Sequence, residues 1–141
     1  MVYLLDTNTV SAIQKHDPIV QRRAAGHSPL TLFISVITVE EQMTGWYTAL
    51  RQAKDETRTI LVWKRLTDTV RFYRTATIVD YDAACIAKFR ELVALKLNVK
   101  HEDLRIAATA LVLGATVVTR NRVDFERIPG VVIEDWHTPD L

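Results

Sequence analysis

With 141 residues, 48% of them hydrophobic, the chain is long enough to bury a core, and we expect a single domain over residues 1–141. Its formal net charge of +1 excludes a strong overall attraction to nucleic acid, so such contacts would have to come from local basic patches. The single cysteine, Cys85, excludes an internal disulfide, and the apolar runs are too short for a signal peptide or a membrane span, so we expect a soluble, cytoplasmic protein.

The first predicted element is a strand over residues 2–5, where a short apolar run is typical of a strand buried on both faces. The run ends abruptly in Asp6, Thr7 and Asn8. Parallel sheets carry their active-site groups at the carboxyl ends of strands, so Asp6 is a candidate for such a group. On these residues alone, a simple cap of the next helix by Asp or Asn is the more common explanation.

Two short helices and a second strand are predicted next. Residues 9–14 have a helical pattern, and Asp17 and Pro18 are typical of the start of another helix, which Gly26 should end. Residues 30–34 are rich in β-forming side chains and predict the second strand. Strands and helices therefore begin to alternate.

A pair of long helices is predicted in the middle of the chain, over residues 35–53 and 55–73. We expect the second helix to have a broad, partly buried apolar face. The residues of that face are Ile60, Leu61, Trp63, Leu66, Val70 and Phe72. Basic residues are frequent in this pair of helices, but the acids between them favour an ordinary solvated surface over a path for RNA.

The second half of the chain continues the alternation. Its predicted elements are, in order, a strand over residues 77–79, a helix from Asp80 or Asp82 to Leu97 that buries Ile86, Phe89, Leu92 and Val93, a helix over 101–113, a strand over 115–119, a loop or turn over 121–126 and a strand over 131–133. Gly114 stands where a helix C-cap commonly has glycine. Together the elements predict an α/β fold with a central, mainly parallel sheet of about 4–5 strands, flanked by helices.

Asp103 stands at the head of an apolar helical stripe that continues through Ile106, Ala107 and Ala110. A lone buried carboxylate is costly, so it must be paired, hydrogen-bonded or bound to a cation. The alternative is that Asp103 only favours the positive end of its helix. The sequence leaves both explanations open.

Further acids stand at the start of a predicted helix or after the end of a predicted strand. Glu40 and Glu41 open the helix after the second strand, and Asp124 follows the end of a later strand. Each has an ordinary explanation as a helix-dipole or turn residue. If they converged with Asp6 and Asp103, their mutual repulsion would call for a cation, and oxygen donors alone favour Mg²⁺ or Mn²⁺. Such a site can hydrolyse a phosphodiester.

Four sequence blocks resemble the PIN-domain nucleases, and most closely the VapC toxins of toxin–antitoxin pairs. The blocks are LLDTNTVS at residues 4–11, SVITVEEQMTG at 35–45, EDLRIAATALVLGATVVTRN at 102–121 and VDFERIPGVVIEDW at 123–136. The resemblance implies a PIN-like sheet with an acidic pocket that uses Mg²⁺ or Mn²⁺ to cleave RNA. It also implies a cognate antitoxin, held near the first and the third-to-fourth helices, and a homodimer. Candidates for that groove or a dimer seam are Trp46, Tyr47 and Trp63, for which core packing is as good an explanation.

The resemblance also assigns roles to individual residues. Asp6 and Asp103 would be direct metal ligands, and Glu41 and Asp124 would orient metal-bound waters or hold a second ion. The supporting residues would be Thr7, Asn8, Thr119 and Asn121. The candidate RNA contacts are Arg120 and Arg122, although exposed arginines are often merely solvated.

Three positions do not fit the family pattern cleanly. Helical angle favours Glu40 as the second acid, whereas the pattern S-x-I-T-x-x-E-x-x-x-G favours Glu41, which we prefer. Gln42 stands where the family often has Leu, and Asn121 where many relatives carry Asp.

Other functions remain open at this point. A PIN-domain RNA-processing nuclease without an antitoxin would share the same residues. A non-catalytic RNA- or protein-binding module is a further alternative, although the full set of acids argues against it. A haloacid-dehalogenase-like phosphatase would need a D-x-D-x-T motif, and Asn8 stands in place of its second Asp.

Overall fold

The computed structural model, which describes residues 1–139, places five short parallel strands in one sheet. In spatial order they are β3 (Thr77–Val79), β2 (Leu32–Ser35), β1 (Tyr3–Leu5), β4 (Thr116–Val118) and β5 (Ile133–Glu134). All four neighbouring pairs are parallel, which confirms the predicted α/β fold. The last two residues of the domain expected over 1–141 lie outside the described residues.

The central strand, β1, sets the position of Asp6. Leu5 pairs with Ile34 of β2 and with Val118 of β4, so these three strands end side by side. The N–H of Asp6 donates to the carbonyl oxygen of Val118 at 3.1 Å and extends the pairing beyond the end of β1. The residues that follow these strands therefore meet at one edge of the sheet.

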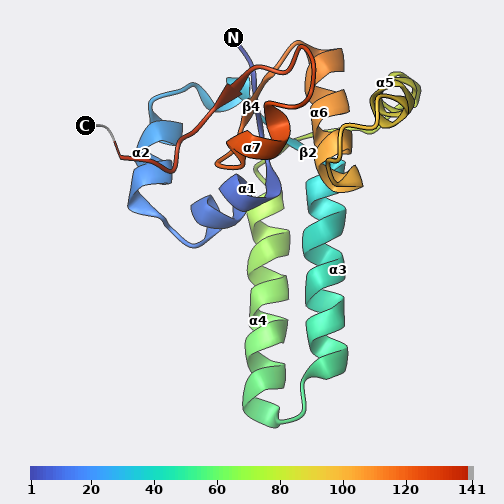
Figure 1. The fold of residues 1–141 in the computed structure, drawn as a ribbon. Helices are drawn as coiled ribbons and strands as arrows, with labels where there is room; N and C mark the ends of the chain where they lie inside the picture. Colours follow the sequence, from blue (N-terminus) through green and yellow to red (C-terminus); the bar gives the residue numbers. More distant parts are fainter. Residues whose placement is uncertain (140–141) are drawn as a thin grey trace.

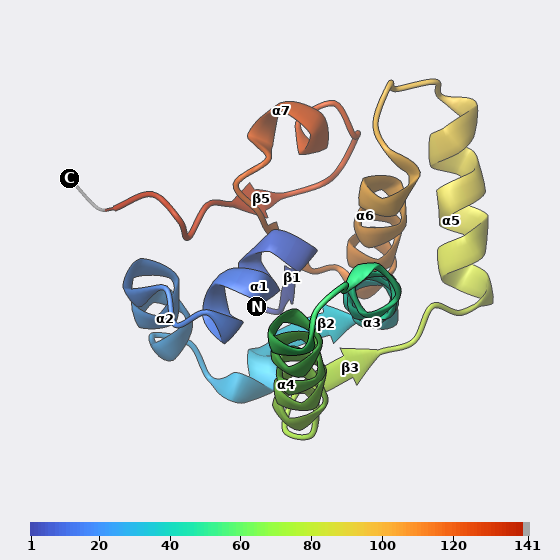
Figure 2. The same ribbon diagram turned by 90° about the horizontal axis from the view of Figure 1, so that it is seen from below.

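Helices cover both faces of the sheet (Figures 1 and 2). In chain order they are α1 (Thr7–Gln14), α2 (Pro18–Ala25), the 3-10 helix η1 (Pro29–Thr31), α3 (Val36–Gln52), α4 (Glu56–Tyr73), α5 (Ala83–Ala94), α6 (His101–Leu113) and α7 (Arg122–Phe125). Because successive strand residues point to opposite faces, Leu4 packs with α5 and α6, whereas Leu5 packs with α1 and Trp136. The sheet is thus buried on both sides.

Capping residues define where most helices begin and end, as predicted. Asp17 Oδ1 accepts hydrogen bonds from the N–H groups of Ile19 and Val20 at the start of α2, and Gly26 ends that helix. Ser35 caps α3 by accepting from the N–H of Ile37. Gly114 ends α6 with a φ of 68°, in the left-handed region that glycine adopts without strain.

Several predicted boundaries were wrong. The second strand begins at Leu32 because Pro29–Thr31 form a 3-10 turn capped by Ser28. The helix predicted to reach Leu97 ends at Ala94. The segment predicted as a loop over 121–126 contains α7, and the last strand is Ile133–Glu134. Ile86 and Val93, expected to be buried, are exposed.

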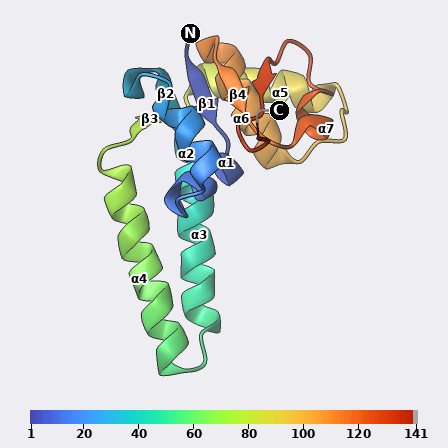
Figure 3. The ribbon, with the colours of Figure 1, turned by 90° about the vertical axis from the view of Figure 1, so that its left-hand side faces the viewer.

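α3 and α4 run side by side and project well beyond the sheet (Figures 1 and 3). The broad apolar face that was predicted to be partly buried on α4 is therefore only partly confirmed. Ile60, Leu61, Trp63 and Val70 are exposed, and a narrower stripe of Val62, Thr69 and Tyr73 is buried. The reason is that α3 is the main element that packs against α4 in the described structure. No helix within residues 1–139 is long and apolar enough to cross a membrane.

Candidate active site

A cavity of about 980 Å³ opens at the carboxyl end of β1. Its walls come from the start of α1, the middle of α3, the first turns of α6 and the segment after β4. Of the residues predicted to form the site, six line this cavity: Asp6, Thr7, Asn8, Glu41, Asp103 and Asn121. The fold thus brings together residues from three of the four sequence blocks.

The surroundings of Asp6 fit both explanations that the sequence allowed, a helix cap and an active-site group. It is only 5% exposed, and its Oδ1 accepts a hydrogen bond from the N–H of Thr9 at 2.8 Å, as an N-cap does. Its Oδ2 accepts no hydrogen bond from any described residue, and the carboxylate lines the cavity. One carboxylate oxygen is therefore used in the fold and the other is available to a ligand.

Two residues that the sequence did not single out hold this part of α1 in place. The hydroxyl of Thr9 donates to the carbonyl oxygen of Val118 at 3.0 Å and lies 3.0 Å from His137 Nε2. A hydroxyl has one hydrogen and a carbonyl can only accept, so His137 Nε2 is the donor to Thr9. The segment after β5 is thereby linked to the turn that presents Asp6.

Asp103 lies in the first turn of α6, next to other acids. Burial raises its pKa above the ordinary range, and the charges of Asp124 and Asp6 raise it further, whereas Lys100 opposes the shift. Asn121 Nδ2 lies 3.4 Å from Asp103 Oδ2 and 2.9 Å from Asp124 Oδ2, so its amide donates to both carboxylates. A neutral amide at this position bridges two acids, where an Asp would add a third negative charge.

Glu41 and Glu40 both line the cavity but differ in their surroundings. Glu41 is half-buried, and its pKa is raised first by burial and then by the charges of Glu102, Asp103 and Glu40, with Thr7 opposing. Glu40 is exposed, and its Oε1 accepts a hydrogen bond from Thr44 at 2.9 Å. The surroundings favour Glu41 as the second acid, and its role stays a prediction.

Four predicted residues lie outside the cavity lining. Thr119 is fully buried, and its Oγ1 accepts from the N–H of Asn121 at 2.9 Å, which fits a supporting place. Asp124 is connected to the cavity through Asn121. Arg120 and Arg122 are exposed, and Arg122 pairs with Glu126 at 3.2 Å.

Two cationic side chains that were not predicted from the sequence also line the cavity. They are Lys100 and Arg105. The Arg105 guanidinium lies over the Phe89 ring, 4.9 Å from its centroid. No local sequence pattern identifies either residue as part of the cavity, because their positions depend on how α5 packs against α6. Their positive charges suit contacts with an anionic ligand in this cavity.

The donors in the cavity suit a hard, hydrated cation. The lining contains the carboxylates of Asp6, Glu40, Glu41, Glu102 and Asp103, and no His or Cys. Within residues 1–139, no three acidic, His or Cys side chains already form a compact metal-binding group. Mg²⁺ binds mainly through one or two carboxylates and keeps several waters, so this set of oxygen donors suits Mg²⁺ or Mn²⁺ better than zinc, which favours His and Cys.

Comparisons with known proteins identify the family and similar folds. The family model of the PIN domain matches residues 3–131. Ribonuclease VapC2 of Rickettsia felis is 30% identical over 142 residues, which cover 96% of this chain and 98% of the relative. The tRNA(fMet)-specific endonuclease VapC of Salmonella typhimurium is 32% identical, over 95% of this chain and 97% of the relative. A DNA-bound VapBC crystal structure from Salmonella typhimurium matches with a TM-score of 0.73 and 30% identity, covering 96% of this chain and 98% of that one.

Proposed function

The chain belongs to the PIN domain family, and on that premise we propose that it is a Mg²⁺- or Mn²⁺-dependent endoribonuclease, the toxin of a type II toxin–antitoxin pair. The observation that carries the proposal is the meeting of Asp6, Glu41 and Asp103 in one cavity, although they come from three distant segments. The names of the relatives, ribonuclease and endonuclease, support the same class of reaction.

The metal ion would be held by Asp6 and Asp103. Asp6 lines the cavity and its Oδ2 accepts no hydrogen bond from a described residue. Burial raises the pKa of Asp103 first, and the like charges of Asp124 and Asp6, which a cation would neutralise, raise it further. When bound, a divalent ion supplies Lewis-acid activation of the scissile phosphate and of a water molecule.

The remaining residues would bind and orient the reactants. Glu41 would orient the attacking water and accept its proton, and its raised pKa brings it nearer to the range useful for a general base. Asp124 would act through Asn121, which it contacts. Lys100 and Arg105 would contact phosphate oxygens, and Arg120 and Arg122 stay predicted contacts of the flanking RNA.

A cleavage assay with matched variants tests this proposal. Purified wild-type protein should cut a structured RNA with Mg²⁺ and stop when the ion is chelated. Asp6→Asn should reduce the cleavage rate by about 10³-fold, because one charged ligand is lost. The control is Glu91→Gln, which removes an exposed acid paired with Lys88 far along α5 and should leave the rate unchanged. Full activity of Asp6→Asn would rule out the proposed site.

The toxin assignment adds a protein partner. The VapBC neighbours are toxin–antitoxin complexes, which supports an antitoxin over a stand-alone RNA-processing role or a non-catalytic module. We propose that a second cavity, of about 1070 Å³ between α1, α3 and α4, receives the antitoxin segment. Trp46 lines this cavity, so it stays a candidate for the groove that would hold the antitoxin. Finding no antitoxin reading frame next to the gene would favour the stand-alone role.

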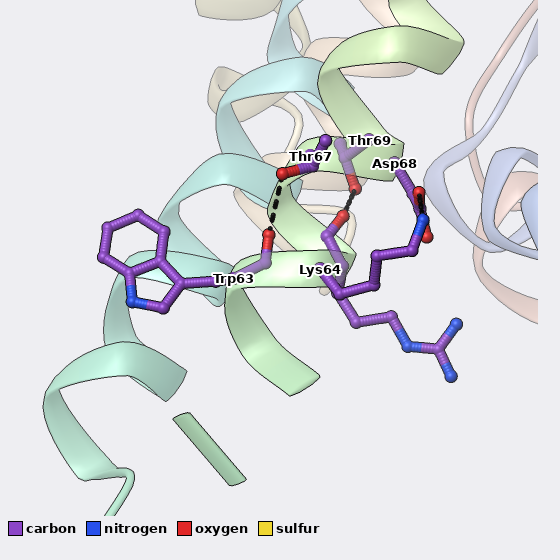
Figure 4. Close-up of polar contacts among 6 residues, drawn as sticks. Trp63, Lys64, Thr67, Asp68 and Thr69 are labelled. Carbon is purple, nitrogen blue, oxygen red and sulfur yellow. Dashed lines mark hydrogen bonds and ion pairs between the residues drawn. The ribbon is translucent and has the colours of Figure 1, made fainter. Parts of the chain in front are cut away.

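The other two predicted aromatic residues lie elsewhere. Tyr47 and Trp63 are exposed and do not line either cavity. Figure 4 shows the Trp63 ring on the opposite side of α4 from Asp68, a residue that does line the second cavity. Trp63 therefore stays a candidate for the seam of the proposed homodimer, which light scattering of the purified chain would test. A cytoplasmic location is likewise proposed from the sequence.

A further inference from the structure

A row of polar contacts joins α1 to α3 directly beside the acidic cavity. The hydroxyl oxygens of Thr7 and Thr38 lie 3.0 Å apart. One turn further along, Gln42 Nε2 donates to Ser11 Oγ at 3.2 Å. Gln42 also exchanges two hydrogen bonds with Gln14, at 2.9 and 3.0 Å. We refer to Thr7, Ser11, Gln14, Thr38 and Gln42 as the α1–α3 seam.

Tyr73 adds a third helix to the seam. It lies at the end of α4, and its hydroxyl donates to Gln42 Oε1. Burial and the charge of Glu41 raise the pKa of Tyr73 well above its ordinary value, so this hydroxyl stays a donor throughout the neutral range. Gln42 is thus the one side chain in the described structure that bonds to residues of both α1 and α4 from α3.

The seam joins the two helices that position Asp6 and Glu41, which both line the acidic cavity. Asp6 directly precedes α1, and Glu41 directly precedes Gln42 in α3. Apolar packing between helices tolerates small shifts, whereas a satisfied set of directional hydrogen bonds favours one register. The register of α1 against α3 in turn sets the separation of the Asp6 and Glu41 side chains.

We propose that Gln42 is a positioning residue of the active site: through Gln14, Ser11 and Tyr73 it fixes α1 against α3 and so sets the spacing of Asp6 and Glu41. This inference rests on the proposed function, because it assigns the spacing a role in metal binding. Gln42 itself lines the second cavity and not the acidic one.

Two variants separate positioning from stability. Gln42→Met leaves the Gln14 amide and the Tyr73 hydroxyl without their partner, so the Tm should fall by about 5 °C. The triple variant Gln14→Met, Gln42→Met and Tyr73→Phe removes all three polar groups together. Most of the Tm should then return, because of the groups that bonded to Gln42 only the Ser11 hydroxyl has lost its partner. The metal-binding geometry should not return, because the hydrogen bonds that fix the register are gone.

The decisive readout is Mn²⁺ affinity, measured by calorimetry on each protein. We expect about 10-fold weaker binding in both Gln42→Met and the triple variant, a size typical of residues that orient metal ligands. The matched control is Thr69→Val, which removes a bond of 2.9 Å between α3 and α4, from Trp46 Nε1 to Thr69 Oγ1. Its Tm should fall while its Mn²⁺ affinity stays at the wild-type value.

The possible outcomes are distinct. Wild-type Mn²⁺ affinity in the triple variant, or equal weakening in Thr69→Val, would overturn the positioning role and leave the proposed function standing. Failure of the wild-type protein to bind Mn²⁺ would instead overturn the proposed function, and the positioning role with it. Weakened binding in both seam variants, with an unchanged control, supports the inference.

Discussion

Helices α6 and α4 are both amphipathic, yet the protein uses them in opposite ways. α6 buries a continuous stretch of side chains from Ile106 to Ala110 between α5 and the sheet and presents Asp103 from its first turn. Distal α4 leaves Ile60 and Trp63 in solvent, and its polar contacts there are local, such as the Lys64–Asp68 pair (Figure 4). The difference indicates that a proposed catalytic acid is carried by a helix packed in the core, whereas distal α4 leaves apolar side chains uncovered in the described structure.

Truncating a matched isoleucine in each helix should give the largest contrast. Ile106→Ala removes a fully packed side chain and should lower the free energy of unfolding by about 2–5 kcal/mol. Ile60→Ala, at a position 60% exposed, should change it by about 0.5 kcal/mol or less. Urea unfolding of the two variants and the wild-type protein measures both values. A similar loss in the two variants would mean that distal α4 is buried in solution, for example by a second copy of the chain.

A smaller effect is expected where α6 meets the segment after β4. Asn121→Asp replaces an amide that donates to Asp103 and Asp124 with a third negative charge. Without metal, we expect the unfolding free energy to fall by about 1–3 kcal/mol. With Mn²⁺ the loss should shrink, because the cation neutralises the added charge. Calorimetric melting with and without Mn²⁺ measures this, and equal losses in both conditions would contradict a cation site at Asp103.

The pH dependence of stability should show the smallest change. The pKa values of Asp103 and Glu41 are raised from their ordinary values of 3.8 and 4.5, mainly by burial. Their protonated forms are thus favoured in the folded state, so their contribution is fully present at low pH and is lost as the pH rises through the raised pKa values. As the pH rises toward neutral, the free energy of unfolding of the metal-free wild-type protein should rise less, or fall more, than that of Asp103→Asn. Melting curves from pH 4.5 to 7.5 test this, and parallel curves for the two proteins would refute it.

The same pair of helices explains how much could be predicted from the sequence. Asp6 and Asp103 were identifiable because each stands at a boundary between local patterns, a strand end and a helix start. The exposure of Ile60 and Trp63 was not, because periodicity shows which face of a helix is apolar but not what covers it. Lys100, Arg105 and the partners of Gln42 were missed for a related reason, since their positions depend on how separate helices pack. The single domain over residues 1–141 and the roles of the site residues stay predictions.

If acids from distant segments form one cation site at the end of β1, the loss of one of them must weaken metal binding. Titration of Mn²⁺ into wild-type protein and into Asp103→Asn, followed by calorimetry, tests it most directly. We expect binding to the wild-type protein and at least about 10-fold weaker binding to the variant, which keeps its fold because it loses a repelled charge. Equal affinity in the two proteins would contradict the claim.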